Sequence, residues 1–264
     1  MITMKLSDVA VNFQKKEVLK GVSITLKGGQ MVSVIGPNGT GKTTLVKAIA
    51  KLVRYSGEVV ITDDDGKRIT TNDIAYVPQM TVTTTDLTVF EMVLLGRVKE
   101  LSWRVEQVHL DAVSKILEEL GLISLSYRPF SRLSGGQRQL VIMAQALVSH
   151  PRVLLLDEPT SALDLRHQLQ VLDIAKKYNK DTGAITIVVI HDLGLAARYS
   201  DYIVLLDDGY SAKEGTPDVV LDEHVLEKAY QVEVDVSVSA GGFKTVTPIR
   251  PSSNLGGMGS EDLH

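Results

Sequence analysis

A glycine-rich turn at residues 36–44 carries the most specific chemical pattern in this chain, GPNGTGKTT. The turn follows the order G-x-x-x-x-G-K-T and lies between an apolar, strand-like run and an amphipathic, helix-like run. Its glycines let backbone N–H groups converge on phosphate oxygens, Lys42 can reach the β and γ phosphates of a nucleotide, and the Thr43 hydroxyl can ligate Mg²⁺. A chance glycine-rich turn is the alternative, and the strand-to-helix context argues against it. The predicted phosphate-binding residues are Gly36, Pro37, Asn38, Gly39, Thr40, Gly41, Lys42, Thr43 and Thr44.

Two adjacent carboxylates, Asp157 and Glu158, follow an apolar run in RVLLLDEP. A bound triphosphate needs one carboxylate near its metal ion and another near the water that attacks the γ-phosphate. Asp157 suits the metal, and Glu158 can orient or deprotonate the water. A solvated acidic strand end is the alternative, but the phosphate-binding turn upstream favours the catalytic interpretation.

A serine followed by two glycines begins another helix-like run in SRLSGGQRQL, residues 131–140. Ser134 is a suitable N-cap, but an N-cap does not explain the glycine pair that follows it. Glycines at a helix N-terminus permit close approach of the backbone to an anion, which predicts a second phosphate-binding end. The pattern alone does not tell whether that phosphate is held by the same chain or by another one.

The elements that position these residues are typical of an α/β fold. Short β-branched runs among residues 1–80, VSITL, MVSVIG, GEVVIT and DIAYVPQ, predict strands. From Asp86 to about His150, apolar residues recur at three- and four-residue intervals, which predicts helices. After Pro151, the runs VLLL and ITIVVI alternate with helical segments, and such continuous apolar strands are typical of a buried parallel sheet.

We therefore expect one large α/β domain with a mainly parallel sheet at residues 1–247. Its core would consist of residues 1–79 and 151–247, and residues 80–150 would form a helical insert. The last segment, residues 248–264, is rich in Gly, Ser and Pro, so we expect a flexible C-terminal tail.

The composition narrows the classes of function. The chain has 264 residues and a formal net charge of −4, which argues against a generally basic nucleic-acid-binding protein. It contains no cysteine, which excludes disulfides and thiolate zinc sites and suits a reducing compartment. The start lacks a signal-peptide pattern, and the apolar runs are too short to span a bilayer. We expect the chain to stay in the cytosol and to work at a membrane only by docking on a partner that spans it.

Five motifs, GPNGTGKTT, LSGGQ, LLLDEP, SALD and VIHD, occur in this order, and over about residues 4–235 the chain resembles the nucleotide-binding subunits of ATP-binding-cassette (ABC) transporters. The resemblance implies a P-loop NTPase core with an N-terminal antiparallel β subdomain and an inserted helical subdomain. It also implies ATP and Mg²⁺ as the bound groups and ATP hydrolysis as the reaction. In this family two subunits form a head-to-tail dimer, and each ATP lies between the phosphate loop of one subunit and the LSGGQ signature of the other.

Further site residues are implied by this resemblance. Phe13 would stack on adenine, where tyrosine is more usual, because stacking needs only a π face; a core aromatic is the alternative. Gln79 would reach the metal and the attacking water, and His191 would contact the γ-phosphate. Asp164 would belong to a loop that crosses the dimer interface, and it also suits a helix N-cap. The signature residues expected to contact the ATP of the other subunit are Ser134, Gly135, Gly136 and Gln137.

Three stretches, DLTVFEMVLLGR, LRHQLQVLDIAKKY and HDLGLAARYSDYIVLLDDG, are similar to importer ATPases of the iron-siderophore, haem and vitamin B12 (cobalamin) uptake group. This resemblance implies a homodimer bound to two transmembrane permease subunits at the cytoplasmic side of the membrane, with an extracytoplasmic substrate-binding protein that delivers a metal chelate. Val89 and Leu94 would line the groove for the permease's cytoplasmic helix, or else fill the core of the insert. Gln145 stands where arginine is common in the family, which concerns a surface contact of the signature helix.

Two other classes of function compete with the importer interpretation. A cassette ATPase acting on nucleic acid or ribosomes usually carries long coiled-coil insertions or two fused cassettes, whereas this chain has one cassette, a short insert and a net negative charge. A P-loop phosphotransferase would have a similar loop but no use for LSGGQ or for a histidine after a late strand. The transported molecule is not identified by the sequence, because the ATPase does not touch it.

Overall fold

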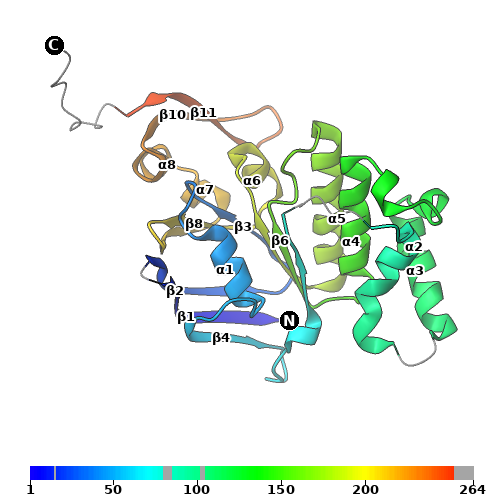
Figure 1. Ribbon diagram of the computed structural model, residues 1–264. Coiled ribbons are helices and arrows are strands. Elements are labelled where there is room, and N and C mark those ends of the chain that lie inside the picture. The colour runs from blue at the N-terminus through cyan, green and yellow to red at the C-terminus, as the bar shows by residue number, and fades with distance from the viewer. Residues whose placement is uncertain (15, 80–84, 102–104, 253–264) are drawn as a thin grey trace, which may run out of the picture.

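The computed structural model describes residues 1–252 except residue 15, residues 80–84 and residues 102–104. The described strands form a three-stranded antiparallel sheet, a six-stranded mainly parallel sheet and a two-stranded hairpin. Figure 1 shows the strand-rich part of the molecule on the left and the helices α2 to α5 on the right. The helices of the predicted insert thus lie to one side of the strand-rich part, which contains helices of its own.

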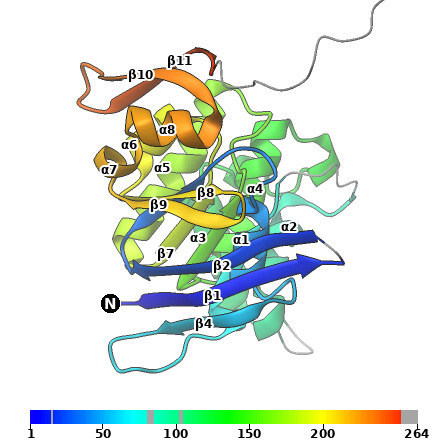
Figure 2. The same cartoon turned by 90° about the vertical axis from the view of Figure 1, so that its left-hand side faces the viewer.

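The three-stranded sheet forms the lower layer in Figure 2. Alternate residues of its central strand are buried, from Met4 to Val11, because one face of the sheet covers the core and the other meets solvent. A register irregularity near Asp8, whose φ is 50°, twists the strand between its two partners. In spatial order the sheet contains β2 (Lys16–Lys27), β1 (Thr3–Phe13) and β4 (Ser56–Thr62).

The six-stranded sheet is parallel except for the pair β8–β9 at one edge. Its inner strands are buried along their whole length, which explains their continuous apolar sequences. In spatial order the sheet contains β5 (Ile74–Val77), β6 (Val153–Asp157), β7 (Ile185–Val189), β3 (Met31–Ile35), β8 (Tyr202–Asp207) and β9 (Tyr210–Gly215). The mainly parallel sheet confirms the predicted fold class.

Helices cover both faces of this sheet. On one face, α1 (Lys42–Ile49) lies between the six-stranded and three-stranded sheets and shares their apolar core. On the other face, α5 (Leu165–Thr182) and α6 (Leu193–Tyr199) pack with the insert in a second core. The alternation along β6 divides these cores, because Leu155 faces α1 whereas Leu154 faces the helical side.

The insert is helical over its described residues. Its first helix begins with a capping box, in which Thr88 and Glu91 exchange side-chain to backbone hydrogen bonds. The helices α2 and α4 pack together beside the sheet, and α3 lies outside them (Figure 1). The insert contains α2 (Val89–Leu94), α3 (Gln107–Glu119) and α4 (Gly135–Leu147), with 3₁₀ helices at Leu95–Glu100, Ile123–Leu125 and Phe130–Arg132. A further 3₁₀ helix, Thr71–Asp73, precedes β5.

The C-terminal part adds a small layer that the sequence analysis did not predict. It contains α7 (Pro217–Val220), α8 (Glu223–Tyr230) and the antiparallel hairpin β10 (Val232–Val238) and β11 (Lys244–Pro251). The strand β11 packs on α6. Residues 248–251, which the sequence analysis assigned to a flexible tail, therefore belong to a paired strand, and residues 253–264 lie outside the described residues.

Across the described ranges, none of the helices is both long enough and apolar enough to cross a bilayer.

Candidate active site

The glycine-rich turn joins β3 to the N-terminus of α1 and is shaped by two obligatory glycines. Gly36 has a φ of 140°, and a Cβ on it would lie 2.1 Å from the Leu206 carbonyl oxygen. Gly41 is the N-cap of α1 with a φ of 100°, and a Cβ there would lie 2.6 Å from Leu19 Cδ2. No side chain caps α1, so the N-terminus of the helix leaves its N–H groups available for an anion.

Lys42 is folded into this turn and is only 5% exposed. Its Nζ donates hydrogen bonds to the carbonyl oxygens of Gly36 at 2.8 Å and Pro37 at 2.7 Å. Burial lowers the pKa of Lys42, and the nearby carboxylates of Glu158 and Asp157 act in the opposite direction. The turn therefore holds a cationic donor close to where its backbone could bind phosphate oxygens.

Asp157 lies at the carboxyl end of β6 and is 2% exposed. Its Oδ1 accepts a hydrogen bond from the Thr43 hydroxyl at 2.8 Å, and its Oδ2 accepts one from the Tyr76 hydroxyl at 2.9 Å. Burial, followed by the charge of Asp157, raises the pKa of Tyr76, so the phenol stays protonated and remains a donor. Tyr76 was not singled out in the sequence analysis, because it is 81 residues away from Asp157 and Gln79 was the one residue of its stretch with a predicted role.

Thr43 and Asp157 fit a magnesium ion by the chemistry of their oxygens. Mg²⁺ prefers hard oxygen ligands and is commonly bound through one or two side chains together with substrate phosphates. The described residues contain no cluster of three His, Asp or Glu side chains that could hold a metal, so a cage made only by the protein is not the arrangement found here. A hydroxyl and a carboxylate beside a phosphate-binding turn suit a metal that arrives with a nucleotide.

Glu158 follows Asp157 and contacts two of the residues expected at the reacting phosphate. Its Oε1 lies 2.7 Å from His191 Nε2, and its Oε2 accepts a hydrogen bond from Gln79 Nε2 at 2.9 Å. The backbone of Glu158 has a φ of 50°, a left-handed conformation that non-glycine residues adopt rarely and mostly at functional sites. Three residues distant in sequence thus meet at the carboxyl edge of the parallel sheet, where α/β proteins bind ligands.

A cavity of about 340 Å³ lies over this edge. It is lined by Glu158, His191 and Phe13 and by six residues of the turn, Asn38, Gly39, Gly41, Lys42, Thr43 and Thr44. Phe13 is 49% exposed, so it is not the core aromatic that was the alternative interpretation. The exposed Lys16 also lines the cavity, and the sequence analysis overlooked it because it lies outside every motif.

The signature turn does not line this cavity. Ser134 Oγ accepts from Gln137 N at 3.3 Å, while Gln137 Oε1 accepts from Ser134 N at 3.1 Å, so the two residues form a capping box for α4. A Cβ on Gly136 would lie 2.2 Å from His167 Cδ2, whereas a Cβ on Gly135 would meet nothing within 4 Å. Gly136 is therefore required by packing within the chain, which the sequence reasoning missed, and Gly135 borders open space.

Asp164 caps α5, in agreement with one of its two predicted roles. Its carboxylate accepts from His167 N at 3.0 Å, and His167 Nδ1 lies 2.8 Å from both carboxylate oxygens. The hydrogen bond from the His167 backbone, followed by that from its side chain, lowers the pKa of Asp164. The His167 ring that fills the space next to Gly136 is thus fixed by Asp164, which links the signature turn to the start of α5.

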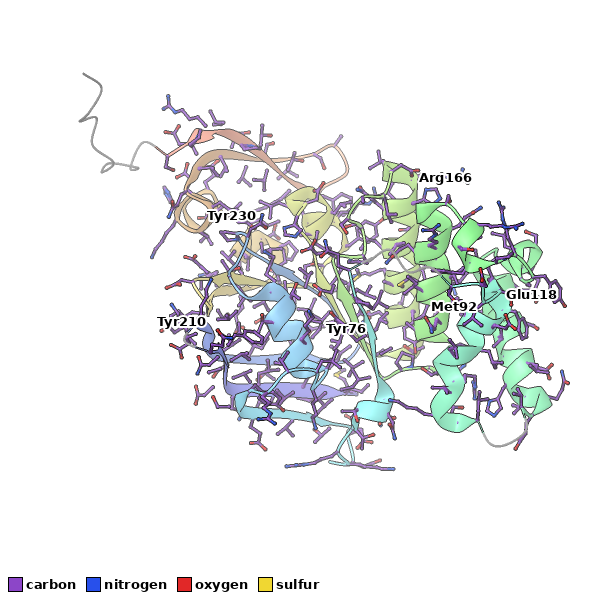
Figure 3. The ribbon with its side chains drawn as sticks, in the orientation of Figure 1. Tyr76, Met92, Glu118, Arg166, Tyr210 and Tyr230 are labelled. Atoms are coloured by element: carbon purple, nitrogen blue, oxygen red, sulfur yellow. The ribbon has the colours of Figure 1, made fainter. Side chains whose placement is uncertain are left out.

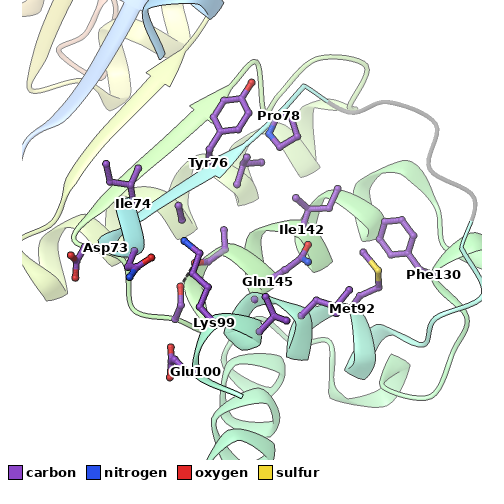
Figure 4. Close-up of a pocket in the computed structure, with 18 residues that line it drawn as sticks. Asp73, Ile74, Tyr76, Pro78, Met92, Lys99, Glu100, Phe130, Ile142 and Gln145 are labelled. Carbon is purple, nitrogen blue, oxygen red and sulfur yellow. Dashed lines mark hydrogen bonds between the residues drawn. The ribbon is translucent and has the colours of Figure 1, made fainter. Parts of the chain in front are cut away.

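A groove of about 630 Å³ separates β5 from the insert (Figure 4). Residues of β5 line the groove together with apolar side chains such as Met92, Leu95 and Ile142. The polar residue Gln145 also lines it. Val89 is fully buried and Leu94 packs against the core, and neither lines the groove. Of the two roles proposed for Val89 and Leu94, the structure therefore supports the core of the insert.

Comparison with known proteins identifies the family. The sequence model of the family described as ABC transporter matches residues 19–161. The iron(3+)-hydroxamate import ATP-binding protein FhuC of Bacillus subtilis is 34% identical over 243 residues, which cover 89% of this chain and 90% of that protein. The petrobactin import ATP-binding protein FpuC of Bacillus anthracis is 37% identical over 228 residues, which cover 83% of both chains.

A solved ABC transporter in an inward-facing conformation contains a chain with the same fold, at a TM-score of 0.83 and 24% identity. The match covers 94% of this chain and 98% of that one. Fold and site define a P-loop ATPase with an inserted helical segment. The chain belongs to the ABC transporter family, and its predicted ATPase class is confirmed. The alternative of a cassette acting on nucleic acid is not supported by these relatives.

Proposed function

We propose that this chain is the ATPase subunit of an importer for a metal chelate, such as an iron-siderophore, haem or cobalamin. The observation that carries the proposal is the contact of Glu158 with both His191 and Gln79 beside the phosphate-binding turn. Two relatives that are named as import proteins, for iron hydroxamate and for petrobactin, support an iron-siderophore as the first candidate.

The proposed reaction transfers the γ-phosphate of ATP to water. Lys42 would bind the β and γ phosphates, and Glu158 would accept the proton of the attacking water. His191 and Gln79 would orient the attacking water and the γ-phosphate. Mg²⁺, when bound, neutralises phosphate charge, and Thr43, Asp157 and Gln79 are the residues that would hold it. The contacts with His191 and Gln79 hold the Glu158 carboxylate before substrate arrives, which reduces the reorganisation needed in the transition state.

The proposed working unit is a homodimer. The signature turn lies outside the cavity of its own chain, and Gly135 borders open space at the N-terminus of α4. A second copy in head-to-tail orientation would place this turn against the ATP bound at Lys42 of the first copy. The interface would also include the Asp164 loop. A monomer is then expected to bind ATP but to hydrolyse it poorly, because half of each site is missing.

The groove between β5 and the insert is the proposed contact with a permease. Its apolar floor around Met92 and Ile142 suits the apolar face of a short helix, and Lys99 and Glu100 can pair with charges at its end. The subunit would then be a peripheral protein at the cytoplasmic side of the membrane, with two copies bound to two permease subunits. The substrate-binding protein would contact the permease and not the ATPase. We expect no nucleic acid to bind to this assembly.

Reconstitution tests the proposal. The chain would be co-purified with the permease and binding protein encoded beside it, placed in vesicles with ATP on the ATPase side, and assayed for uptake of iron-siderophores, haem and cobalamin. We expect ATP-dependent uptake of one of these chelates, and its loss in the Glu158→Gln variant. ATP hydrolysis without uptake of any of the three, together with recovery of ribosomes or DNA in place of a permease, would contradict the proposal.

A further inference from the structure

Tyr76, which the sequence analysis did not single out, contacts the carboxylate that is expected to bind the metal. It lies near the middle of the molecule (Figure 3), and its hydroxyl donates to Asp157 Oδ2 at 2.9 Å. Thr43, which is expected to ligate the metal, donates to the other oxygen, Oδ1, at 2.8 Å. Each oxygen of this buried carboxylate therefore has its own hydroxyl donor, one from α1 and one from β5.

The pairing of β5 with β6 explains why Tyr76 reaches Asp157. In the parallel register Tyr76 lies opposite Leu155, which is two residues before Asp157 and on the same face of the sheet. A tyrosine side chain that leans along the strand spans this two-residue offset, whereas a shorter side chain at the same position would not. The contact thus follows from strand register and from the length of a tyrosine.

The two hydroxyl donors differ in what metal binding would do to them. A carboxylate that is 2% exposed needs hydrogen bonds to remain ionised at low cost. The Thr43 hydroxyl is itself an expected ligand, so its oxygen would be shared between the metal ion and the contact with Asp157. Tyr76 has no such second role, and Lys42 is bonded to backbone carbonyl oxygens. Of the described donors to Asp157, Tyr76 is the one with no expected metal contact of its own.

We propose that Tyr76 is a positioning residue for magnesium, which fixes the orientation of Asp157 by holding its Oδ2 and leaves Oδ1 directed at the metal. Some residues hydrogen-bond to a metal-ligating carboxylate without touching the metal themselves. Their removal commonly lowers the metal affinity by about 10- to 100-fold. This inference rests on the proposed ATPase function, because the metal would arrive with ATP.

The same strand also borders the groove proposed for the permease. The Tyr76 ring points away from Met92 and Ile142 in Figure 4, whereas Ala75 and Val77 pack on the helical side of the sheet. All four residues of this strand border the groove, and Tyr76 among them also reaches Asp157 with its hydroxyl. A displacement of β5 by a docked helix would act on the orientation of Asp157 through Tyr76.

The Tyr76→Phe variant tests the proposal, because it removes the hydroxyl and keeps the ring. The full chain would be melted with a non-hydrolysable ATP analogue while Mg²⁺ is raised from micromolar to millimolar concentrations, and analogue binding would also be measured with EDTA. Tyr199→Phe is the matched control, since the Tyr199 hydroxyl donates to a carboxylate oxygen of Asp173 at 2.8 Å, away from the cavity residues.

We expect Tyr76→Phe to raise the Mg²⁺ concentration at the midpoint of stabilisation by about tenfold. Binding of the analogue in EDTA should change by less than about twofold, and Tyr199→Phe should shift neither quantity. An unchanged midpoint in Tyr76→Phe would overturn the proposal, as would an equal loss of binding in EDTA, which would indicate a general packing defect. The readout needs no permease or chelate, so failure of the importer assignment would leave it unaffected.

Discussion

Among the described helices, α1 and α4 both have glycine at their N-terminus, and they differ in the residues that surround it. At α1 the N-cap is Gly41 with no side-chain cap, and the surrounding cavity is lined by Lys42, Thr43, Glu158 and His191 of the same chain. At α4 the N-cap is Ser134, whose capping box satisfies the first turn, and the turn contributes nothing to that cavity. The cavity at α1 thus contains most of the predicted catalytic residues of this chain. The N-terminus of α4 has only its cap and faces open space at Gly135.

The difference shows that glycine has separate functions in the two turns. In the α1 turn, Gly36 and Gly41 adopt left-handed conformations that open the backbone towards a ligand. In the α4 turn, Gly136 is needed because the His167 ring occupies the place of a Cβ, and Gly135 alone has free space. Anion binding at α4 would therefore centre on the exposed side of Gly135, and it would require the phosphate to come from another chain.

The largest effect is expected from Glu158→Gln, which removes the proposed base at the α1 site. The turnover number should fall by about 10²- to 10⁴-fold, because a neutral amide does not accept the proton of the attacking water. ATP binding should be retained, and an ATP-bound dimer should accumulate. Phosphate release and equilibrium ATP binding measure the two quantities, and normal turnover in the purified transporter would remove Glu158 from this role.

A smaller effect, on binding, is expected from Lys42→Ala. Loss of one charge-assisted contact to the phosphates corresponds to about 2–3 kcal/mol, so ATP affinity should fall by roughly 30- to 150-fold. Lys47→Ala is the matched control, since Lys47 lies in the last turn of the same helix. Calorimetric titration with ATP would show this contrast, and equal affinities of the two variants would mean that the α1 turn is not the nucleotide site.

The smallest effect concerns folding and separates the two signature glycines. Gly136→Ala should lower the free energy of unfolding by about 1–3 kcal/mol, because its methyl group would overlap the His167 ring that Asp164 fixes. Gly135→Ala should change it by less than about 0.5 kcal/mol, since nothing lies within 4 Å. Thermal melting of the two variants checks this, and equal melting temperatures would contradict the packing role of Gly136.

Much of the α1 site could be predicted from sequence because its chemistry is local. The turn, the strand before it and the helix after it are contiguous, and the carboxylates of RVLLLDEP end a strand whose apolar run marks it as buried. The parallel sheet and the helical insert followed from the same periodicities. The family and its ATPase class followed from the ordered motifs, and the comparisons confirm both.

The rest depended on contacts that sequence spacing does not encode. Tyr76 reaches Asp157 through the register of two strands, and Gly136 meets His167 through helix packing. The strand β10 was missed although its sequence, VEVDVSV, alternates valine with polar residues as a half-buried strand does, and its partner β11 is mostly exposed and lacks an apolar pattern. Val89 and Leu94 were compatible with two roles, the permease groove or the core of the insert, and only tertiary packing shows that both pack in or against the core.

The central claim is that the active site is shared between two chains, with the α4 turn of one facing the ATP of the other. The most direct test adds Gly135→Asp to Glu158→Gln, because a carboxylate in the first turn of α4 favours the helix but would repel a partner's γ-phosphate. Light scattering with Mg²⁺ and ATP should show a dimer for Glu158→Gln and a monomer with ATP still bound for the double variant. A stable ATP-bound dimer of the double variant would contradict the claim.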